Sequence, residues 1–333
     1  MNRAHAEKIV RDFRGQRILV IGDLILDEFI WGKVSRISPE APVPVVEVAS
    51  ESYYPGGSAN VARNIREFAD EVRVMGLLGA DAHAEKLTGL LRQQRIDLSC
   101  LQADANYQTI VKTRIIARQQ QVVRVDRERK TQLTEVQTIR LLEQLDEVLP
   151  DTDGIIFEDY GKGMLQQELV DRILDRARAH NVTTAVDPHP QNRIAWRDVT
   201  AITPNRSEAF AAAGQSGDPV DPPGDDKTLH EVGSLLLQKW RPQNLLITLG
   251  EQGMMLFRAN KEPFHIPTRA REVFDVSGAG DTAIALFTLA LCAGATPEDA
   301  AELSNHASGI VVGKLGTAIV SPAELLASFD DAH

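Results

Sequence analysis

The sequence is poor in cysteine and has no long apolar run. Its two cysteines, Cys100 and Cys292, lie far apart with no second pair, so neither a disulfide framework nor a paired-cysteine zinc site is indicated. No apolar stretch reaches the roughly 18 residues of a membrane-spanning helix, and residues 1–15 are charged rather than signal-like. We therefore expect a cytoplasmic protein with no membrane partner.

Acidic residues outnumber basic ones, 47 to 36. The net charge of −11 argues against a surface for nucleic acid or acidic lipid, although it leaves room for a local basic pocket. A Walker A loop is absent, because Gly313-Lys314 lacks both the following Ser or Thr and the earlier glycine spacing. The eight histidines show no metal-ligand spacing. Classical P-loop chemistry and a histidine metal centre are thereby excluded.

The chain of 333 residues is long enough for one large α/β domain or two ordinary ones. It contains no repeat, no low-complexity tract and no obvious interdomain linker. We therefore expect a single domain over residues 1–333.

Short apolar runs that end in polar residues recur along the chain. Residues 17–23, 154–159, 182–187 and 199–203 are such runs, and the polar residues at or just after their ends are Asp23, Asp159, Asp187, Asn205 and Glu208. Because parallel strands bind ligands at their carboxyl ends, this pattern predicts one parallel sheet with a ligand crevice along that edge. A turn or helix cap is the alternative explanation for each residue.

Two segments interrupt this alternation. Residues 28–54 are rich in proline and contain an alternating run, and residues 107–126 resemble a β-hairpin around Gln119-Gln-Gln. We expect the two segments to form a small β lid. Arg114, Arg118 and Arg124 concentrate positive charge on it, which indicates either a solvated face or a site for a sugar phosphate.

The stretch 55–69 predicts a helix that follows a glycine pair. Gly56 and Gly57 permit close approach of a ligand to the backbone, and Ser58 is the expected N-cap. In the first turn, Asn60 is placed to hydrogen-bond a sugar hydroxyl. A purely structural glycine turn is the alternative.

The turn Phe274–Thr282 lies between a stretch expected to be extended (265–274) and an almost wholly apolar helix (283–292). Gly278 and Gly280 free the backbone to point successive N–H groups at one spot, and the helix start adds its own, so the turn suits an anion. Asp281 places a carboxylate at this anion site. It is either a helix cap or a general base that takes a proton from a hydroxyl attacking phosphorus.

The same glycines also fit a loose dinucleotide-binding fingerprint, Gly278-x-Gly280-x-x-Ala283. However, the motif lies late in the chain, Asp281 would face the pyrophosphate, and the residues about twenty further on belong to a helix. Phosphoryl transfer explains the acid, the backbone donors and the polar strand ends together, so we interpret the motif as that of a kinase. On the helix expected after Thr296, Asn305 and Gly309 share a face against which an adenine ring could lie, although helix packing also explains the glycine.

Three motifs resemble, in the same order, the signatures of the ribokinase-like (PfkB) sugar kinases. They are Gly56-Gly57-x-x-Asn60, Asn205-x-x-Glu208 and Asp275-x-x-Gly-Ala-Gly-Asp281. The resemblance covers essentially the whole chain and implies a three-layer αβα sandwich with a mostly parallel central sheet and a small β lid. Within the family, the chain is similar to the D-glycero-β-D-manno-heptose-7-phosphate kinases of lipopolysaccharide core synthesis, in a stand-alone form without a nucleotidyltransferase domain. The closer match is carried by Ser35–Val46, Asp159–Gly163, Glu251–Gly253 and Val312–Thr317.

The resemblance implies transfer of the ATP γ-phosphoryl group to the anomeric hydroxyl, giving the 1,7-bisphosphate of ADP-heptose synthesis. It implies Mg²⁺, a monovalent cation such as K⁺ as a further candidate, and a homodimer formed through the lid. The implied catalytic residues are Asp281 as base and Gly278, Ala279 and Gly280 as the anion hole. The implied nucleotide residues are Asn205, Glu208, Thr248, Gly250, Gly253 and Asn305, with Glu208 reaching Mg²⁺ through water. The implied substrate residues are Asp23, Gly56, Gly57 and Asn60 for the sugar, with Lys162 and Arg124 as candidates for its phosphate.

Two positions depart from the pattern of these kinases. Residue 277 is Ser where Thr is usual, which keeps the hydroxyl, and His189 stands where a lysine often follows Asp-Pro. A neutral imidazole cannot fully replace an ammonium group, so a phosphate-binding role at position 189 is in doubt. The alternatives are another sugar-phosphate kinase of the same fold or a catalytically silent sugar-phosphate-binding regulator. The intact Asp281 argues against the regulator, since a pure binder gains nothing from that acid.

Overall fold

The first strand divides its apolar residues between two cores. In β1 (Arg17–Gly22), Ile18 and Val20 pack into one hydrophobic cluster, and Leu19 and Ile21 pack into the other. Successive side chains of a strand point to opposite faces, so a run buried on both faces belongs to a central strand covered on both sides. The expected three-layer α/β/α arrangement is confirmed.

The computed structural model describes residues 1–118, 120–270, 273–314 and 317–330. Parts of three predicted segments lie outside these ranges. They are Gln119 of the expected hairpin turn, residues 271–272 of the expected extended stretch, and residues 315–316 of the Val312–Thr317 motif.

The main sheet has nine strands in the order β13-β12-β11-β10-β9-β8-β1-β4-β5. The strands from β11 to β5 pair in parallel, and β12 and β13 add an antiparallel edge. All parallel strands therefore point their carboxyl ends to one edge, as predicted. The strands other than β1 are β4 (Glu71–Gly79), β5 (Asp97–Asp104), β8 (Gly154–Glu158), β9 (Thr183–Asp187), β10 (Ala201–Ile202), β11 (Asn244–Thr248), β12 (Met254–Phe257) and β13 (Phe264–Ile266).

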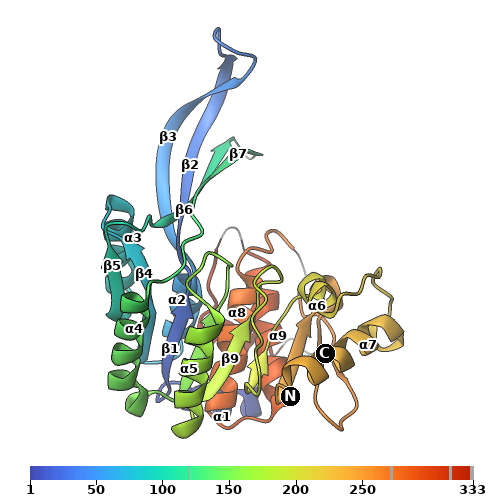
Figure 1. The fold of residues 1–333 in the computed structure, drawn as a ribbon. Coiled ribbons are helices and arrows are strands. Elements are labelled where there is room, and N and C mark those ends of the chain that lie inside the picture. Colours follow the sequence, from blue (N-terminus) through green and yellow to red (C-terminus); the bar gives the residue numbers. More distant parts are fainter. Residues whose placement is uncertain (119, 271–272, 315–316, 331–333) are drawn as a thin grey trace.

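Helices cover both faces of this sheet (Figure 1). One layer contains α1 (Arg3–Asp12), α2 (Ser58–Arg66), α3 (Ala82–Gln93), α8 (Ala279–Cys292), α9 (Pro297–Val311) and α10 (Pro322–Ala327). The other contains α4 (Glu135–Val148), α5 (Gln167–Ala179), α6 (Arg206–Ala213) and α7 (Lys227–Trp240). Three short 3₁₀ turns occur at Leu149–Asp151, Pro223–Asp225 and Gly250–Gln252. Within the described ranges, no helix combines the length and apolarity needed to cross a membrane.

A second sheet of four strands forms the predicted lid. Its order is β3-β2-β6-β7, and its strands are β2 (Leu24–Ile37), β3 (Pro44–Gly57), β6 (Ile110–Ala117) and β7 (Gln120–Arg127). In Figure 1 the long β2–β3 arm projects well beyond the main sheet. Because β2 begins only two residues after β1 ends, the lid emerges directly from the carboxyl edge of the main sheet.

Glycines close the junction between the two sheets. Gly57 pairs with Leu24 and has a φ of +59°, a left-handed conformation that favours glycine. A Cβ at Gly56 would overlap the Asp27 carboxylate, so this position also excludes a side chain. The structural explanation for the glycine pair therefore holds, whether or not a ligand also approaches it.

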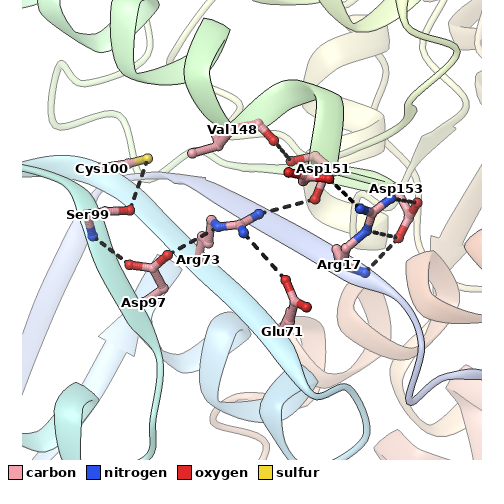
Figure 2. Close-up of polar contacts among 10 residues, drawn as sticks. Arg17, Glu71, Arg73, Asp97, Ser99, Cys100, Val148, Asp151 and Asp153 are labelled. Atoms are coloured by element: carbon pink, nitrogen blue, oxygen red, sulfur yellow. Dashed lines mark hydrogen bonds and ion pairs between the residues drawn. The ribbon is translucent and has the colours of Figure 1, made fainter.

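The amino ends of the strands are tied together by ion pairs (Figure 2). Arg17 contacts Asp153 at 3.0 Å and Asp151 at 2.8 Å, and it thereby joins β1 to the segment before β8. Arg73 in β4 contacts Asp97 at 3.2 Å and the Asp151 carbonyl at 3.2 Å. This network lies at the edge of the sheet opposite the predicted crevice, so structural and candidate functional charges are spatially separated.

Candidate active site

The turn before α8 has the geometry of an anion site. Gly278 is the N-cap with a φ of +80°, and α8 begins at the next residue. The N–H of Ala279 donates to the Val276 carbonyl at 3.3 Å, whereas the N–H groups of Gly278 and Gly280 have no acceptor among the described residues. Two donors at a helix start, together with the helix dipole, can therefore receive an anion.

Asp281 does not cap this helix. It lies in the first turn, three residues after the N-cap, and makes no capping hydrogen bond. Instead its carboxylate accepts from Asn60 Nδ2 at 2.6 Å and from the Tyr160 hydroxyl at 3.2 Å. Of the two explanations for this residue, capping is therefore ruled out by the contacts.

The environment of Asp281 raises the pKa of its carboxyl group. The residue is 8% exposed. Burial raises the pKa of Asp281 above that of an ordinary aspartate, and the hydrogen bonds from Asn60 and Tyr160 oppose part of the rise. A carboxylate whose pKa is moved upward while both oxygens are oriented by donors suits a general base.

Asn60 reaches Asp281 from the start of α2. The N-cap of this helix is Gly57, so the prediction that Ser58 is the cap was wrong. The positive φ of Gly57 turns the chain directly into the helix, and the Ser58 hydroxyl donates to the Asp23 carbonyl at 3.1 Å instead. Asn60 is 1% exposed, and its Oδ1 has no hydrogen-bond partner among the described residues.

Tyr160 was not singled out from the sequence. It belongs to the loop after β8, and that loop is held by Asp23, whose carboxylate accepts from the N–H groups of Tyr160 (3.2 Å), Lys162 (3.0 Å) and Met164 (3.3 Å). Asp23 is 1% exposed, and burial raises its pKa while these backbone donors oppose the rise. Asp23 thus positions Tyr160, and its predicted contact with the sugar stays a prediction.

Three carboxylates meet behind the turn. Glu158, Asp187 and Asp281 each offer an oxygen, and these oxygens lie within 4.8 Å of one another. Burial raises the pKa of Glu158 and of Asp187 well above the usual values, and neighbouring carboxylates add to both shifts. The sequence predicted Asp187 at this edge but not Glu158.

Asp159 faces a different environment from its neighbour Glu158. Asn192 Nδ2 donates to its two oxygens at 2.9 and 3.1 Å, and the Gly161 N–H donates at 2.8 Å. Burial raises the pKa of Asp159 to about 6, and the Asn192 hydrogen bond opposes the rise. Asp159 therefore orders the loop that follows β8, consistent with the alternative of a turn residue.

Asn205 and Glu208 form a reciprocal cap at the start of α6. The Asn205 side chain accepts from the Glu208 N–H at 3.0 Å, and Glu208 Oε2 accepts from the Asn205 N–H at 2.9 Å. Asn205 also bridges Thr248 at the end of β11. Burial raises the pKa of Glu208, whose charge in turn raises that of Asp187, so the capping box lies beside the acidic cluster.

A cavity of about 390 Å³ opens next to the anion site. Four predicted nucleotide residues and two residues of the turn line it together, namely Thr248, Gly250, Gly253, Asn305, Ala279 and Gly280. Asn305 Nδ2 donates to the Pro267 carbonyl at 2.7 Å. Gly309 also lines the cavity, and a Cβ there would lie 3.0 Å from backbone atoms of the 269–270 segment, so close packing explains this glycine.

The predicted basic residues do not gather at one point. Arg114 pairs with Asp27, Arg124 pairs with Asp126 at 2.8 Å, and Arg118 is exposed in the lid hairpin with a φ of +60°. Lys162 pairs with Glu128 at 2.7 Å.

Lys112 on β6 was not predicted from the sequence as a site residue. It makes no ion pair with any residue that the structure describes, and its Nζ lies 5.3 Å from the centre of the Tyr160 ring. Burial lowers the pKa of Lys112, which Asp27 partly opposes. Burial raises the pKa of Asp281, and the charge of Lys112 is one of the influences that oppose the rise.

His189 is influenced by three lysines, Lys162, Lys130 and Lys112. Burial lowers its pKa, and the charges of Lys162, Lys130 and Lys112 lower it further. The imidazole is therefore neutral near pH 7, and the ammonium groups carry the positive charge of the region.

Comparisons with known proteins agree on the family. Residues 16–324 match the pfkB family carbohydrate kinase. The chain is 42% identical over 315 residues to the bifunctional protein HldE of Sodalis glossinidius (strain morsitans), covering 94% of this chain and 63% of that protein. It is 40% identical over 319 residues to the protein of the same name from Desulfatibacillum aliphaticivorans, covering 96% of this chain and 64% of that protein. The chain thus spans just under two thirds of the length of these curated relatives.

Solved structures agree on the fold. Phosphofructokinase-2 from Escherichia coli in complex with potassium superposes with a TM-score of 0.78 at 17% identity, covering 95% of this chain and 98% of that one. Ribokinase from Thermotoga maritima superposes with a TM-score of 0.71 at 22% identity, covering 95% and 99%.

Removal of the Tyr160 hydroxyl tests its influence on Asp281. Because a hydrogen bond to the ionised form lowers the pKa of an acid, we expect Tyr160→Phe to raise the pKa of Asp281 further. The measurement is a ¹³C NMR titration of labelled aspartates, with the Asp281 signal assigned by its loss in Asp281→Asn. Tyr53→Phe, which removes a hydroxyl bonded to Glu51 on the lid, is the control. An unchanged Asp281 titration in Tyr160→Phe would contradict the role.

Proposed function

The chain belongs to the pfkB family of carbohydrate kinases, and from that premise we propose that it phosphorylates D-glycero-β-D-manno-heptose 7-phosphate. The γ-phosphoryl group of ATP is transferred to the anomeric hydroxyl, which gives the 1,7-bisphosphate. Identity of about 40% to proteins named HldE supports this choice of substrate, as do the motifs shared with the heptose-7-phosphate kinases.

The observation that carries the proposal is the position of Asp281. Its buried carboxylate is oriented by Asn60 and Tyr160 and lies one residue after Gly280, whose N–H is available to an anion. A hydroxyl bound in front of Asp281 can therefore lose its proton as it attacks a phosphorus held at the turn. The N–H groups of Gly278 and Gly280, which have no acceptor among the described residues, stabilise the charge that develops on the transferred group, whereas the Ala279 N–H donates to the Val276 carbonyl.

The adjacent cavity suits the nucleotide. Thr248, Gly250, Gly253 and Asn305 border it, and it opens onto the turn where the γ-phosphate would lie. Carboxylate oxygens at this edge fit a hard cation, and Glu208, ordered by Asn205, is placed to hold Mg²⁺ through water. When bound, Mg²⁺ neutralises charge on the phosphates. A monovalent cation such as K⁺ is a further proposed component.

The sugar would lie between the two sheets. Asn60 Oδ1, which lacks a partner among the described residues, is a free acceptor for a sugar hydroxyl. Gly56 and Gly57 leave the backbone approachable, and Asp23 orders the loop that closes this side. For the 7-phosphate we propose Lys112 together with Lys162, with Arg124 as a more exposed contributor.

The lid would also form a dimer interface. Apolar side chains on it remain exposed, among them Ile37 at 61% and Val48 at 57%. Surfaces of this kind are typical of interfaces, so we propose a homodimer in which two lids pack together. We further propose that the chain acts as one kinase domain with the lid as its appendage.

Parallel assays with three sugars test the function directly. We expect ATP turnover with heptose 7-phosphate to exceed that with fructose 6-phosphate and ribose by at least about 100-fold in kcat/KM, since a polar site rejects substrates that leave its charged groups unpaired. A preference for fructose 6-phosphate or ribose would refute the heptose assignment. Absence of turnover with every sugar would favour the silent regulator.

Replacement of the base should stop the chemistry without removing the nucleotide. We expect Asp281→Asn to lower kcat by about 10³-fold or more, because proton abstraction is lost while the fold and the cavity are kept. ATP affinity, measured by calorimetry, should stay within about threefold of the original value. The control is Asp299→Asn, which changes an acid at the equivalent position of α9, outside the site. Near-normal turnover in Asp281→Asn would disprove the base assignment.

We expect Lys112 to contribute to binding of the sugar phosphate and not to binding of ATP. Loss of a charge-assisted contact of about 1.5 to 3 kcal/mol corresponds to about 10- to 100-fold, so we expect Lys112→Met to raise KM for heptose 7-phosphate by that factor. KM for ATP should stay nearly unchanged. Lys33→Met, on β2 of the same lid, is the matched control. Equal changes in KM for heptose 7-phosphate in the two variants would show that Lys112 does not bind the phosphate.

A further inference from the structure

A second cavity lies between α6, the end of α7 and residues 188–196, the segment that follows β9. Its volume of about 520 Å³ falls in the range of roughly 300–1,000 Å³ that is typical of small-molecule sites. It shares no lining residue with the cavity proposed for the nucleotide. The kinase reaction proposed above therefore leaves this cavity without an assigned ligand.

Two of the three tryptophans in the chain, Trp196 and Trp240, line this cavity. They are 1% and 4% exposed, and Trp196 packs against Phe157 with the ring centres 5.5 Å apart, so core packing holds this aromatic wall in place. Trp240 Nε1 makes no hydrogen bond within the described part of the chain. The N–H of a buried tryptophan usually has an acceptor, so an oxygen of a ligand in the cavity would supply the missing one.

The charged residues that line the cavity are Arg193, Lys239 and Glu208. Lys239 Nζ donates to the Ala212 carbonyl at 2.8 Å and so offsets the negative end of α6. Glu208 Oε2 accepts from the Asn205 N–H in the capping box. Arg193 is exposed and makes no ion pair with any residue that the structure describes. Because guanidinium donors match the oxygens of a carboxylate, sulfonate or phosphate, the uncompensated charge of the cavity favours an anion.

We propose that this cavity binds a small organic anion with a flat apolar body. The flat part lies against Trp196 and Trp240, and Ile194 and the alanines of α6 complete the apolar lining. The anionic group lies at Arg193, where it gains a positive partner that the chain does not compensate. The inference rests on this cavity alone, so it does not depend on which sugar is phosphorylated.

Tryptophan fluorescence can report binding in this cavity directly. The variant Trp31→Phe removes the tryptophan of the lid strand β2 and leaves Trp196 and Trp240 as the only tryptophans. The probe is anilinonaphthalene sulfonate, which combines flat rings with a sulfonate and accepts excitation energy from tryptophan. Saturating MgATP is present throughout, so that the nucleotide cavity is occupied. We expect saturable quenching of the tryptophan fluorescence with one probe bound per chain.

Two arginine variants in the Trp31→Phe protein test where the sulfonate lies. Arg193→Gln should weaken probe binding by about fivefold or more. Arg197→Gln, which changes an exposed arginine outside the cavity, is the matched control and should stay within about twofold. The uncharged analogue N-phenylnaphthylamine should bind equally to the parent protein and to Arg193→Gln.

Three results would overturn the proposal. They are the absence of saturable quenching in the presence of MgATP, equal effects of Arg193→Gln and Arg197→Gln on probe binding, and equal affinity of the parent protein for the charged probe and its uncharged analogue. Because binding is measured without any sugar, these outcomes are independent of the sugar-kinase assays.

Discussion

The burial of one carboxylate organises this protein. Asp281 is 8% exposed and lies in the first turn of a helix whose next nine residues are all buried, so protein donors supply most of the hydrogen bonds that water would give its oxygens. Asn60 and Tyr160 supply these donors from segments more than 100 residues away in the chain. Each donor depends on further structure: Asn60 on the positive φ of Gly57, and Tyr160 on a loop held by Asp23. The turn is thus the meeting point of elements that the sequence separates widely.

Charge is distributed unevenly around this point. Glu158 and Asp187 lie together with Asp281, and Glu208 lies beside them, whereas Lys112 belongs to the lid strand β6.

The two ends of the strands in the main sheet carry charged groups in different arrangements. At the amino ends, Arg17 and Arg73 meet their carboxylates in partly exposed ion pairs, which contribute modestly to the free energy of unfolding. At the carboxyl ends, the acids lie beside one another with few compensating cations. Such an arrangement disfavours the folded state unless ligands or protons compensate it, which is typical of binding sites rather than of packing.

The class of fold, the lid and the position of the turn could be predicted from the sequence, because they follow from local periodicity, proline and glycine placement and motif spacing. Asp187 was correctly predicted at the end of a buried strand, at the carboxyl edge of the sheet. Which polar side chains come into contact could be seen only in the folded chain. Glu158 and Asp159 are adjacent in the chain, yet the alternation of a strand sends only Glu158 to the acidic cluster. Lys112 of the lid strand β6 and Tyr160 of the loop after β8 belong to separate parts of the chain, yet the Lys112 Nζ lies 5.3 Å from the centre of the Tyr160 ring. No local pattern encodes that contact, since it depends on strand order and on the path of two distant segments.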